Sequence, residues 1–292
     1  MSNSKQFGFG FLDKALFYTS YLLNKTLFIW FEVKSPKLRM FAAEFLYSVG
    51  KVIRLKESIL DYRKVRIDSV ETIFGKFKTR PGTMDIICVS PAFERPDLDH
   101  LLEILSKNRS FGKKILFLDI GADIGTYAIS VANRFNDIDV IAFEPTTVNR
   151  RFLLENIALN KRQIEVVPKA LGQREGIVTI YLHEENPGGN TAHAKASQPA
   201  AHKETVEMVT LDSLLGGRAQ NYDLVVFKID VEGMEKDVLE GSNRVLSSGV
   251  DCIFMVEDFV DGEIIKYLHQ LGAEFVTKKT PYNSFWRISS LI

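Results

Sequence analysis

The sequence predicts an α/β fold in which helices cover both faces of a mostly parallel sheet. From residue 114 onward, short apolar runs of strand character alternate with amphipathic helical stretches, as in strand–helix–strand units. The runs are almost continuous in apolar residues, which is typical of strands buried on both faces. The 292 residues, 46% of them apolar and 25% charged, suit a globular chain with one large domain.

Residues 1–66 predict a helical N-terminal extension, because they lack strand alternation and repeat apolar residues at helical spacing. Residues 16–33 approach the length of a membrane span, but Asn24 and Lys25 fall in the middle. A lysine there makes a true span costly. A helix on the membrane surface and a helix packed on the body or on a partner both remain open. Residues 67–292 form the second predicted domain.

The second domain is expected to begin with strands and then a helix. VETIFGKF and MDIICVS flank KTRPGT, whose Pro-Gly pair indicates a turn, so both runs are interpreted as strands. PDLDHLLEILSK has Pro and acids at its start and Lys near its end. These are the boundary signals of a helix.

The parallel sheet is predicted from five apolar runs. They are KILFLDI, DVIAFEP, IEVVPKAL, DLVVFKID and CIFMVED. TYAISVANRF, TVNRRFLLENIAL and EKDVLEGSNRVL are the predicted helices between them. GIVTIYLHE and TVEMVTL are two extra strands around a polar loop, and EFVTKK with SFWRISS predicts a terminal antiparallel hairpin.

Charge and cysteine content argue against several classes of protein. Lys plus Arg and Asp plus Glu both number 37, so there is no basic excess of the kind that general nucleic-acid binding requires. Cys88 and Cys252 each lie in an apolar run, which indicates buried thiols in a reducing compartment. We expect no secretory signal and a cytoplasmic protein, located at the inner face of the membrane if the N-terminal segment is a surface helix.

The ends of the predicted strands indicate a ligand site. Ligands of open α/β sheets bind at the carboxyl ends of the strands. These ends carry Asp119, Glu144, Ala170, Asp230 and Glu257, four of which are acidic. We therefore expect these residues to line one cleft.

The turn in FLDIGADIGTYA does not match a phosphate-binding loop. A dinucleotide fingerprint has three glycines in G-x-G-x-x-G, but Asp123 and Thr126 occupy the second and third glycine positions after Gly121. Asp119 and Asp123 would also repel a pyrophosphate, since two like charges about 4 Å apart repel by roughly 4 kcal/mol at a dielectric of 20. An NAD-dependent oxidoreductase is therefore the weaker alternative.

S-adenosylmethionine fits the same turn better, because it has no phosphate and carries an ammonium and a sulfonium. Asp119 would favour that cation directly or through water. Gly121 and Gly125 would let the backbone approach the ligand and enter the helix without a Cβ clash. Glu144 ends the next strand, where a carboxylate can accept hydrogen bonds from both ribose hydroxyls.

FKIDVEG ends the fourth parallel strand, which we expect to lie beside the first. Lys228, Asp230 and Glu232 alternate there, and Gly233 permits a sharp exit into a helix starting near Met234. The predicted catalytic residues are Asp230 and Glu232. They would accept a proton from an attacking hydroxyl, or hold the methionine ammonium or orient the substrate. No metal-ligand cluster is evident, so we expect no metal.

The polar loop GGNTAHAKASQPAAHK, residues 188–203, is a candidate substrate-binding loop, because long loops in compact domains are often lids. Asn190, Thr191 and His193 are the predicted substrate contacts. His193 and His202 are alternative bases.

DIGADIGTYA, VIAFEP with FLLENIALN behind it, KALG, TLDSLL and FKIDVEGMEKDVLEGS resemble the FkbM-type methyltransferases over about residues 85–260. The resemblance implies a Rossmann-like class I methyltransferase fold and methyl transfer from S-adenosylmethionine, usually to a hydroxyl oxygen. The family usually has Asn where Asp123 stands. The predicted cofactor-binding residues are Asp119, Gly121, Ala122, Gly125, Tyr127, Glu144, Ala170 and Asp230.

The resulting prediction is an S-adenosylmethionine-dependent O-methyltransferase for a small molecule, sugar or glycan, such as a bacterial surface glycan. An NAD-dependent oxidoreductase and a non-catalytic S-adenosylmethionine-binding scaffold or membrane adaptor are the alternatives. We expect no nucleic-acid partner. The N-terminal helices would mediate a peripheral membrane contact or homo-oligomerisation.

Overall fold

The computed structural model describes residues 69–89, 93–193, 202–258, 263–280 and 282–289. The extension predicted at residues 1–66 lies outside them, so its helices and its role stay predictions. Within the described ranges, no helix is long and apolar enough to cross a lipid bilayer.

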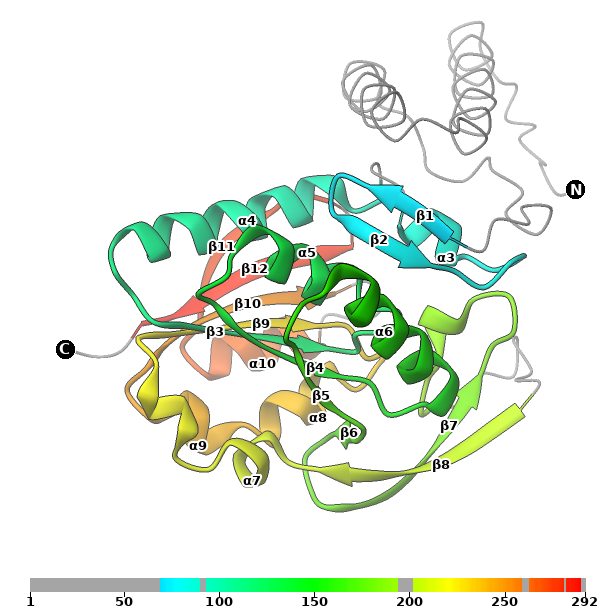
Figure 1. Cartoon of the computed structure of the whole chain (residues 1–292). Coiled ribbons are helices and arrows are strands. Elements are labelled where there is room, and N and C mark those ends of the chain that lie inside the picture. Colours follow the sequence, from blue (N-terminus) through cyan, green and yellow to red (C-terminus); the bar gives the residue numbers. More distant parts are fainter. Residues whose placement is uncertain (1–68, 90–92, 194–201, 259–262, 281, 290–292) are drawn as a thin grey trace, which may run out of the picture.

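A seven-stranded sheet forms the centre of the described structure (Figure 1). Across the sheet the strands are β11 (Glu274–Lys278), β12 (Asn283–Ile288), β10 (Asp251–Glu257), β9 (Leu224–Ile229), β3 (Ile115–Ile120), β4 (Asp139–Phe143) and β5 (Glu165–Val167). The five strands from β10 to β5 are parallel, whereas β12 and β11 are antiparallel. The predicted sheet, its terminal hairpin and the pairing of β9 with β3 are therefore confirmed.

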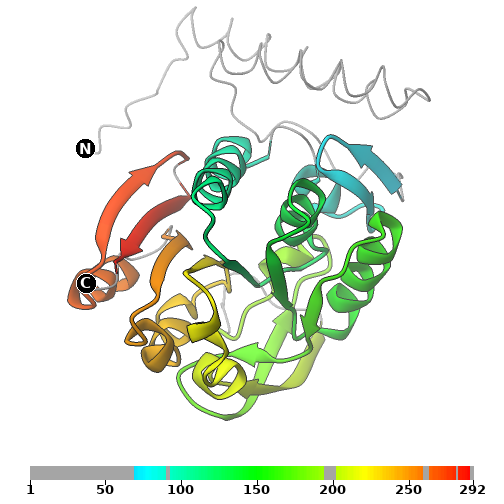
Figure 2. The same cartoon turned by 60° about the vertical axis from the view of Figure 1, so that its left-hand side comes forward.

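Helices cover both faces of this sheet, as predicted (Figure 2). One face carries α4 (Arg95–Ser110), α5 (Thr126–Arg134) and α6 (Thr147–Asn160). The other face carries α7 (Leu211–Leu215), α8 (Glu235–Glu240), α9 (Asn243–Leu246) and α10 (Glu263–Gln270). Every residue of β3 and β9 is buried, which explains why these strands have no polar face.

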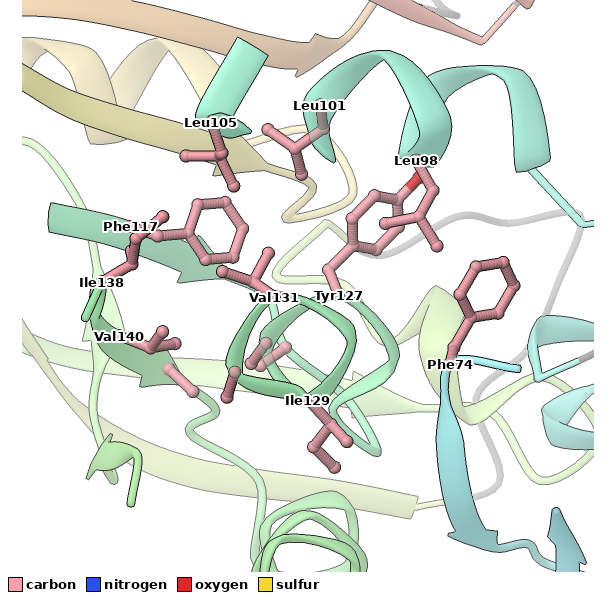
Figure 3. Close-up of a cluster of buried hydrophobic side chains, with 14 of the residues drawn as sticks. Phe74, Leu98, Leu101, Leu105, Phe117, Tyr127, Ile129, Val131, Ile138 and Val140 are labelled. Atoms are coloured by element: carbon pink, nitrogen blue, oxygen red, sulfur yellow. The ribbon is translucent and has the colours of Figure 1, made fainter. Parts of the chain in front are cut away.

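The core on the α4 side forms because α4 places leucines at helical spacing toward the sheet (Figure 3). Leu98, Leu101 and Leu105 are buried there in one cluster with Phe117 of β3 and Val131 of α5. Burying such a side chain contributes about 1.5–3 kcal/mol. This packing fixes the N-terminal end of α4 over the carboxyl ends of the strands.

A second sheet of three strands lies beside the first, in the order β6 (Ala170–Leu171), β8 (His202–Val209) and β7 (Gly176–Leu182). The single strand predicted at IEVVPKAL is therefore wrong, since its halves form β5 and β6 in different sheets. Pro168 separates them, and proline cannot donate a backbone hydrogen bond to a ladder. Ala170 thus belongs to the second sheet instead of ending a strand of the first.

The segment before α4 forms a hairpin and one helical turn. The single strand predicted at VETIFGKF is wrong, because this run folds back on itself: β1 (Ser69–Thr72) and β2 (Gly75–Lys78) pair with each other. The side chains of Asn156 and Asn160 in α6 bond the backbone of β2.

The strand predicted at MDIICVS is wrong, because the run is the short helix α3 (Asp85–Cys88). Its start is set by side chains that the apolar pattern does not reveal. The Thr83 hydroxyl accepts from the backbone N–H of Asp85, and the Asp85 carboxylate binds Arg80. Cys88 in this helix and Cys252 in β10 are both free thiols; Cys252 is buried, as predicted, whereas Cys88 is only half-buried.

The single helix predicted at EKDVLEGSNRVL is also interrupted, since α8 and α9 are separate. Gly241 lies between them, where an added Cβ would come 2.1 Å from the carbonyl oxygen of Gly172. The close backbone approach explains the glycine. Two 3₁₀ turns complete the described elements, at Pro187–Gly189 and Arg218–Asn221.

Candidate active site

Two cavities open where β3, β4, β9 and β10 end. The β4 cavity contains Glu144 and Ala170 in its lining, and the β9 cavity contains Glu94 and Glu257. Four residues line both cavities, namely Gly121, Asp123, Gly188 and Asp230. The two cavities are therefore adjoining halves of one groove at the predicted edge of the sheet.

Gly121 is the backbone junction between the two halves. Its φ is +83°, and an added Cβ would lie 1.7 Å from the carbonyl oxygen of Asp230. Its N–H donates to the carbonyl oxygen of Phe143, 3.1 Å away. Only glycine fits between the ends of β9 and β4, so the close approach that the structure shows is to the neighbouring strand end, and the approach of Gly121 to a ligand stays a prediction.

Gly125 lies at the entry into α5, as predicted. It precedes α5 with φ +92°, and an added Cβ would lie 2.6 Å from Cδ1 of Leu153. It lines neither of the two cavities. The glycine therefore permits the entry into α5 and the packing of α5 on α6, and its approach to a ligand stays a prediction.

Asp119 is buried beneath the groove and lines neither cavity. Its Oδ2 accepts from the backbone N–H of Ala128 at 2.8 Å, and its Oδ1 lies 3.9 Å from Nζ of Lys228. Burial raises the pKa of Asp119, while Lys228 lowers it. In this structure Asp119 contributes to the charge of the groove by lying close to Lys228, and its own side chain does not line the groove.

Lys228 joins several parts of the site. Its Nζ donates to Oδ2 of Asp230 at 3.0 Å and to the carbonyl oxygen of Gly121 at 3.4 Å, and it lies 5.1 Å from the ring centroid of Tyr127. Burial alone would lower the pKa of Lys228, but Asp230 and Asp119 raise it above its ordinary value. Lys228 therefore stays charged and holds these groups together.

Glu144 is buried in the β4 cavity and already accepts three hydrogen bonds. Its Oε1 accepts from the backbone N–H and the hydroxyl of Thr146 at 2.9 and 2.7 Å. Its Oε2 accepts from the backbone N–H of Asp123 at 3.0 Å. Burial, followed by the charge of Asp123, raises the pKa of Glu144 to about 7. A carboxylate has about four acceptor sites, so after these three hydrogen bonds one site remains, on Oε2. The two ribose hydroxyls of the predicted contact would need two sites.

Asp123 has φ +46°, a conformation that Asn and Asp adopt more readily than most residues. Its Oδ1 accepts from Nη2 of Arg80 at 2.8 Å. Arg80 also binds the carboxylate of Asp85 and the side-chain oxygen of Asn149. Arg80 was not predicted as a site residue. It lies far from the turn in the sequence, and no sequence pattern indicates that its guanidinium would neutralise Asp123.

Three further acids converge in the β9 cavity. Asp230, Glu232 and Glu257 each bring one oxygen to within 4.8 Å of the others. Burial, followed by the charges of Asp230 and Glu232, raises the pKa of Glu257 to about 9. Three carboxylates could bind a divalent cation such as Mg²⁺ or Ca²⁺, but convergence of acids alone does not identify one, and we assign no metal.

Glu94 is the carboxylate on the α4 side of the β9 cavity, and the sequence analysis missed it. Its Oε2 accepts from the hydroxyl of Tyr127 at 2.8 Å. Burial, followed by the charge of Asp230, raises the pKa of Glu94 to about 7. The acids at the predicted start of the helix in PDLDHLLEILSK are Asp97 and Asp99, and no sequence pattern indicates that the side chain of Glu94 lies in the groove.

The remaining predicted cofactor contacts lie along the groove. Ala122 and Tyr127 line the β9 cavity, and Ala170 lines the β4 cavity although it belongs to the second sheet. Glu232 lines the β9 cavity with φ +52°, after β9 has ended at Ile229. The strand therefore does not continue as the alternation of FKIDVEG assumed.

The predicted substrate residues separate into two groups. Asn190 lines the β4 cavity, and its Oδ1 accepts from the backbone N–H of His183. Thr191 and His193 lie outside both cavity linings and contact the turn after β9. The Thr191 hydroxyl donates to the carbonyl oxygen of Glu232 at 2.7 Å, and Nε2 of His193 lies 3.2 Å from that of Gly233. Residues 194–201 of the loop lie outside the described ranges.

A family model described as the methyltransferase FkbM domain matches residues 119–275, more than half of the chain. The chain belongs to the FkbM methyltransferase family. The predicted family membership is therefore confirmed, and the protein is a methyltransferase. The match begins and ends within the predicted domain at 67–292, whose boundaries stay a prediction.

The chain is also similar to individual proteins. It is 24% identical over 180 residues to Methyltransferase 1 of Beauveria bassiana strain ARSEF 2860, covering 56% of this chain and 68% of that protein. Among solved structures it resembles the Pyrococcus abyssi tRNA (uracil-54, C5)-methyltransferase in complex with S-adenosyl-L-homocysteine, with 13% identity, a TM-score of 0.41 and coverage of 76% of this chain and 43% of that one.

A second solved structure is the precorrin-6y C5,15-methyltransferase of Geobacter metallireducens GS-15. Identity is 15% and the TM-score 0.35, with coverage of 61% of this chain and 81% of that one. The strand order and the terminal hairpin described above give the FkbM domain the Rossmann-like class I methyltransferase fold.

Proposed function

We propose that this FkbM domain transfers a methyl group from S-adenosylmethionine to a hydroxyl of a small molecule, sugar or glycan. The observation that carries this proposal is the continuous groove, whose two halves meet at Gly121 and Asp230. When bound, S-adenosylmethionine supplies an electrophilic methyl group on a positively charged sulfur. A two-part groove accommodates such a donor in one half and an acceptor in the other.

The β4 cavity has the chemistry for the adenosine part of the donor. Ala170, Leu171, Val178 and Ile180 provide apolar surface at the second sheet, which suits a flat heterocycle. The remaining acceptor site of Glu144 is available to one ribose hydroxyl. No phosphate is required, and the acids of the groove would repel one.

The β9 cavity has the chemistry for a hydroxylated acceptor. Phe74, Met84 and Phe93 supply apolar surface, while Asp230 and Glu232 supply carboxylate oxygens. Carboxylates accept hydrogen bonds from hydroxyl groups and orient them. We propose that Asp230 and Glu232 position the acceptor hydroxyl, and that much of the rate enhancement comes from this positioning.

Titration calorimetry tests the proposed donor directly. The purified chain is titrated in parallel with S-adenosylmethionine, S-adenosylhomocysteine and NAD. We expect saturable binding of the first two ligands and none of NAD. NAD binding would favour the oxidoreductase alternative, and no binding by any of the three would contradict the proposed donor.

Transfer to oxygen is tested with a methyl-labelled donor and fractionated small-molecule and glycan extracts. Mass spectrometry should find the label in a methyl ether. Label found only on nitrogen or carbon would contradict the proposed hydroxyl acceptor while leaving the donor proposal intact.

A further inference from the structure

Glu94 has a conformation that its place before a helix does not explain. It immediately precedes α4 with φ +44°, in the left-handed region that a glutamate rarely adopts. An acid in this position normally turns back to accept from the first N–H groups of the helix. Glu94 makes no such side-chain bond. Its carboxylate instead lies in the β9 cavity, where Tyr127 holds it.

The hydrogen bond to Tyr127 leaves one oxygen of this carboxylate available. Oε2 accepts from the Tyr127 hydroxyl at 2.8 Å, so Oε1 is the atom that can receive a proton. The ring of Tyr127 also packs on the ammonium of Lys228, which connects Glu94 to the strand end that carries Asp230.

Two other carboxylates of the cavity, Asp230 and Glu257, are less suited to receive a proton. Asp230 holds Lys228 at 3.0 Å, so protonating this half-buried carboxylate would remove an ion-pair partner of the buried Lys228 ammonium. Glu257 has a pKa raised to about 9, by burial and then by Asp230 and Glu232, so it is already protonated at neutral pH.

Glu94, in contrast, changes charge near neutral pH. Burial and then Asp230 raise its pKa to about 7, Lys228 and the Tyr127 hydrogen bond lower it, and Asp97 on α4 raises it. A general base works best when its pKa lies near the working pH.

We infer that Glu94 is the base that takes the proton of the acceptor hydroxyl, an inference that rests on the proposed function. The acceptor oxygen forms a bond to the methyl carbon while the methyl–sulfur bond breaks and leaves its electron pair on sulfur. The hydroxyl proton passes to Oε1 of Glu94. One sulfonium and one carboxylate thereby become a neutral thioether and a neutral carboxylic acid, and the proton then leaves to solvent.

The inference can be tested without the acceptor by using sinefungin, in which an amine-bearing carbon replaces the methylated sulfur. Its ammonium lies where the methyl group of the donor would lie, so a base near that point should bind it. The measurement is the ratio of the sinefungin and S-adenosylhomocysteine dissociation constants. In Glu94→Gln the preference for sinefungin should fall about tenfold, the loss expected for a charge-assisted hydrogen bond, with S-adenosylhomocysteine affinity within about twofold.

Matched variants and pH distinguish a base from a structural residue. Glu103→Gln, on the exposed side of α4, should leave the ratio unchanged. In the unmodified chain the sinefungin preference should weaken as pH falls through about 7, since protonated Glu94 has no charge. Tyr127→Phe removes a bond that lowers the pKa of Glu94, so this transition should move to higher pH.

Two results would overturn the inference. One is a sinefungin preference in Glu94→Gln within about twofold of that of the unmodified chain. The other, which holds even if this variant does not fold, is a preference in the unmodified chain that is constant between about pH 6 and 8. Failure of the unmodified chain to bind S-adenosylhomocysteine at all would instead refute the proposed function.

Discussion

The two halves of the groove both bury carboxylates, but they compensate the charge differently. In the β4 cavity, Glu144 accepts three hydrogen bonds from Thr146 and Asp123. In the β9 cavity, Asp230, Glu232 and Glu257 approach one another closely and have Lys228 as a nearby cation. In the first half, hydrogen bonds from the chain compensate part of the charge of Glu144, whose pKa is still raised to about 7 by burial and then by Asp123. The second holds excess negative charge that a proton or a cationic ligand can relieve.

Gly121→Ala should have the largest effect, because it acts on both halves at once. The new Cβ would collide with the carbonyl oxygen of Asp230 at 1.7 Å, so one strand end must move. We expect a loss of more than about 3 kcal/mol in the free energy of unfolding, measured by urea denaturation.

The control for this substitution is Gly249→Ala. Gly249 has a similar φ of +79°, but nothing lies within 4 Å of its added Cβ. Only the backbone penalty of about 1–2 kcal/mol should remain. Equal losses in the two variants would contradict the role of Gly121 as a steric junction.

Glu144→Ala should weaken S-adenosylmethionine binding in the β4 cavity and leave the β9 cavity unchanged. Loss of a hydrogen bond from a ribose hydroxyl to a charged acceptor costs about 1–3 kcal/mol, and calorimetry with S-adenosylmethionine would measure it. Glu165→Ala, at the opposite end of β5 and paired with Arg218, serves as the control. Unchanged affinity in a folded Glu144→Ala variant would exclude the ribose contact.

Glu257→Gln, in the β9 cavity, should raise the free energy of unfolding of the protein by an amount that depends on pH. The pKa of this group rises from its ordinary 4.5 to about 9 on folding, so the folded state keeps a proton that the unfolded state has released. The free energy of unfolding of the unmodified chain therefore falls as pH rises between these values. The variant should gain on the order of 1 kcal/mol at pH 8, after solvent screening, and less at pH 5.

Denaturation curves of both proteins across this pH range provide the measurement. Glu103→Gln, exposed on α4, should leave the pH dependence unchanged. A Glu257→Gln variant that is less stable than the unmodified chain at pH 8 would show that the ionised carboxylate is stabilised there.

Deletion of residues 1–66 should have the smallest effect on either half of the groove. Among the described residues, those that line the two cavities begin at Phe74, so S-adenosylmethionine affinity should stay within about twofold. Self-association or liposome binding should change instead, because large apolar surfaces mark interaction sites. Analytical ultracentrifugation and vesicle flotation would measure both, and no change in either would refute the proposed role of this segment.

The sequence predicted the parts of the fold that depend on local pattern. The apolar runs of β3 and β9 and the leucine spacing of α4 identify their elements without tertiary information. The predicted elements were wrong where contacts with distant or neighbouring side chains determine the secondary structure. The run that begins at Asp85 forms a helix because Thr83 and Arg80 fix its first turn. Pro168 divides a run that hydropathy alone predicts as one strand.

The site was predictable where residues follow parallel strands, since the ends of such strands meet at one edge. Asp230 and Glu144 were found in this way. Arg80 and Glu94 were missed because they reach the groove from segments before the first parallel strand. Their positions depend on how the hairpin and α4 pack on the sheet, which no local pattern encodes.

The contact between Gly121 and Asp230 bears on the design of inhibitors. A bisubstrate compound that joins a donor analogue to an acceptor analogue would place its linker over this point, where the surface of Gly121 is main chain alone. A side chain at position 121 would collide with the neighbouring strand end. A substitution of Gly121 that blocks the linker would therefore also disrupt the protein. Resistance to such a compound would therefore have to arise at other positions along the groove.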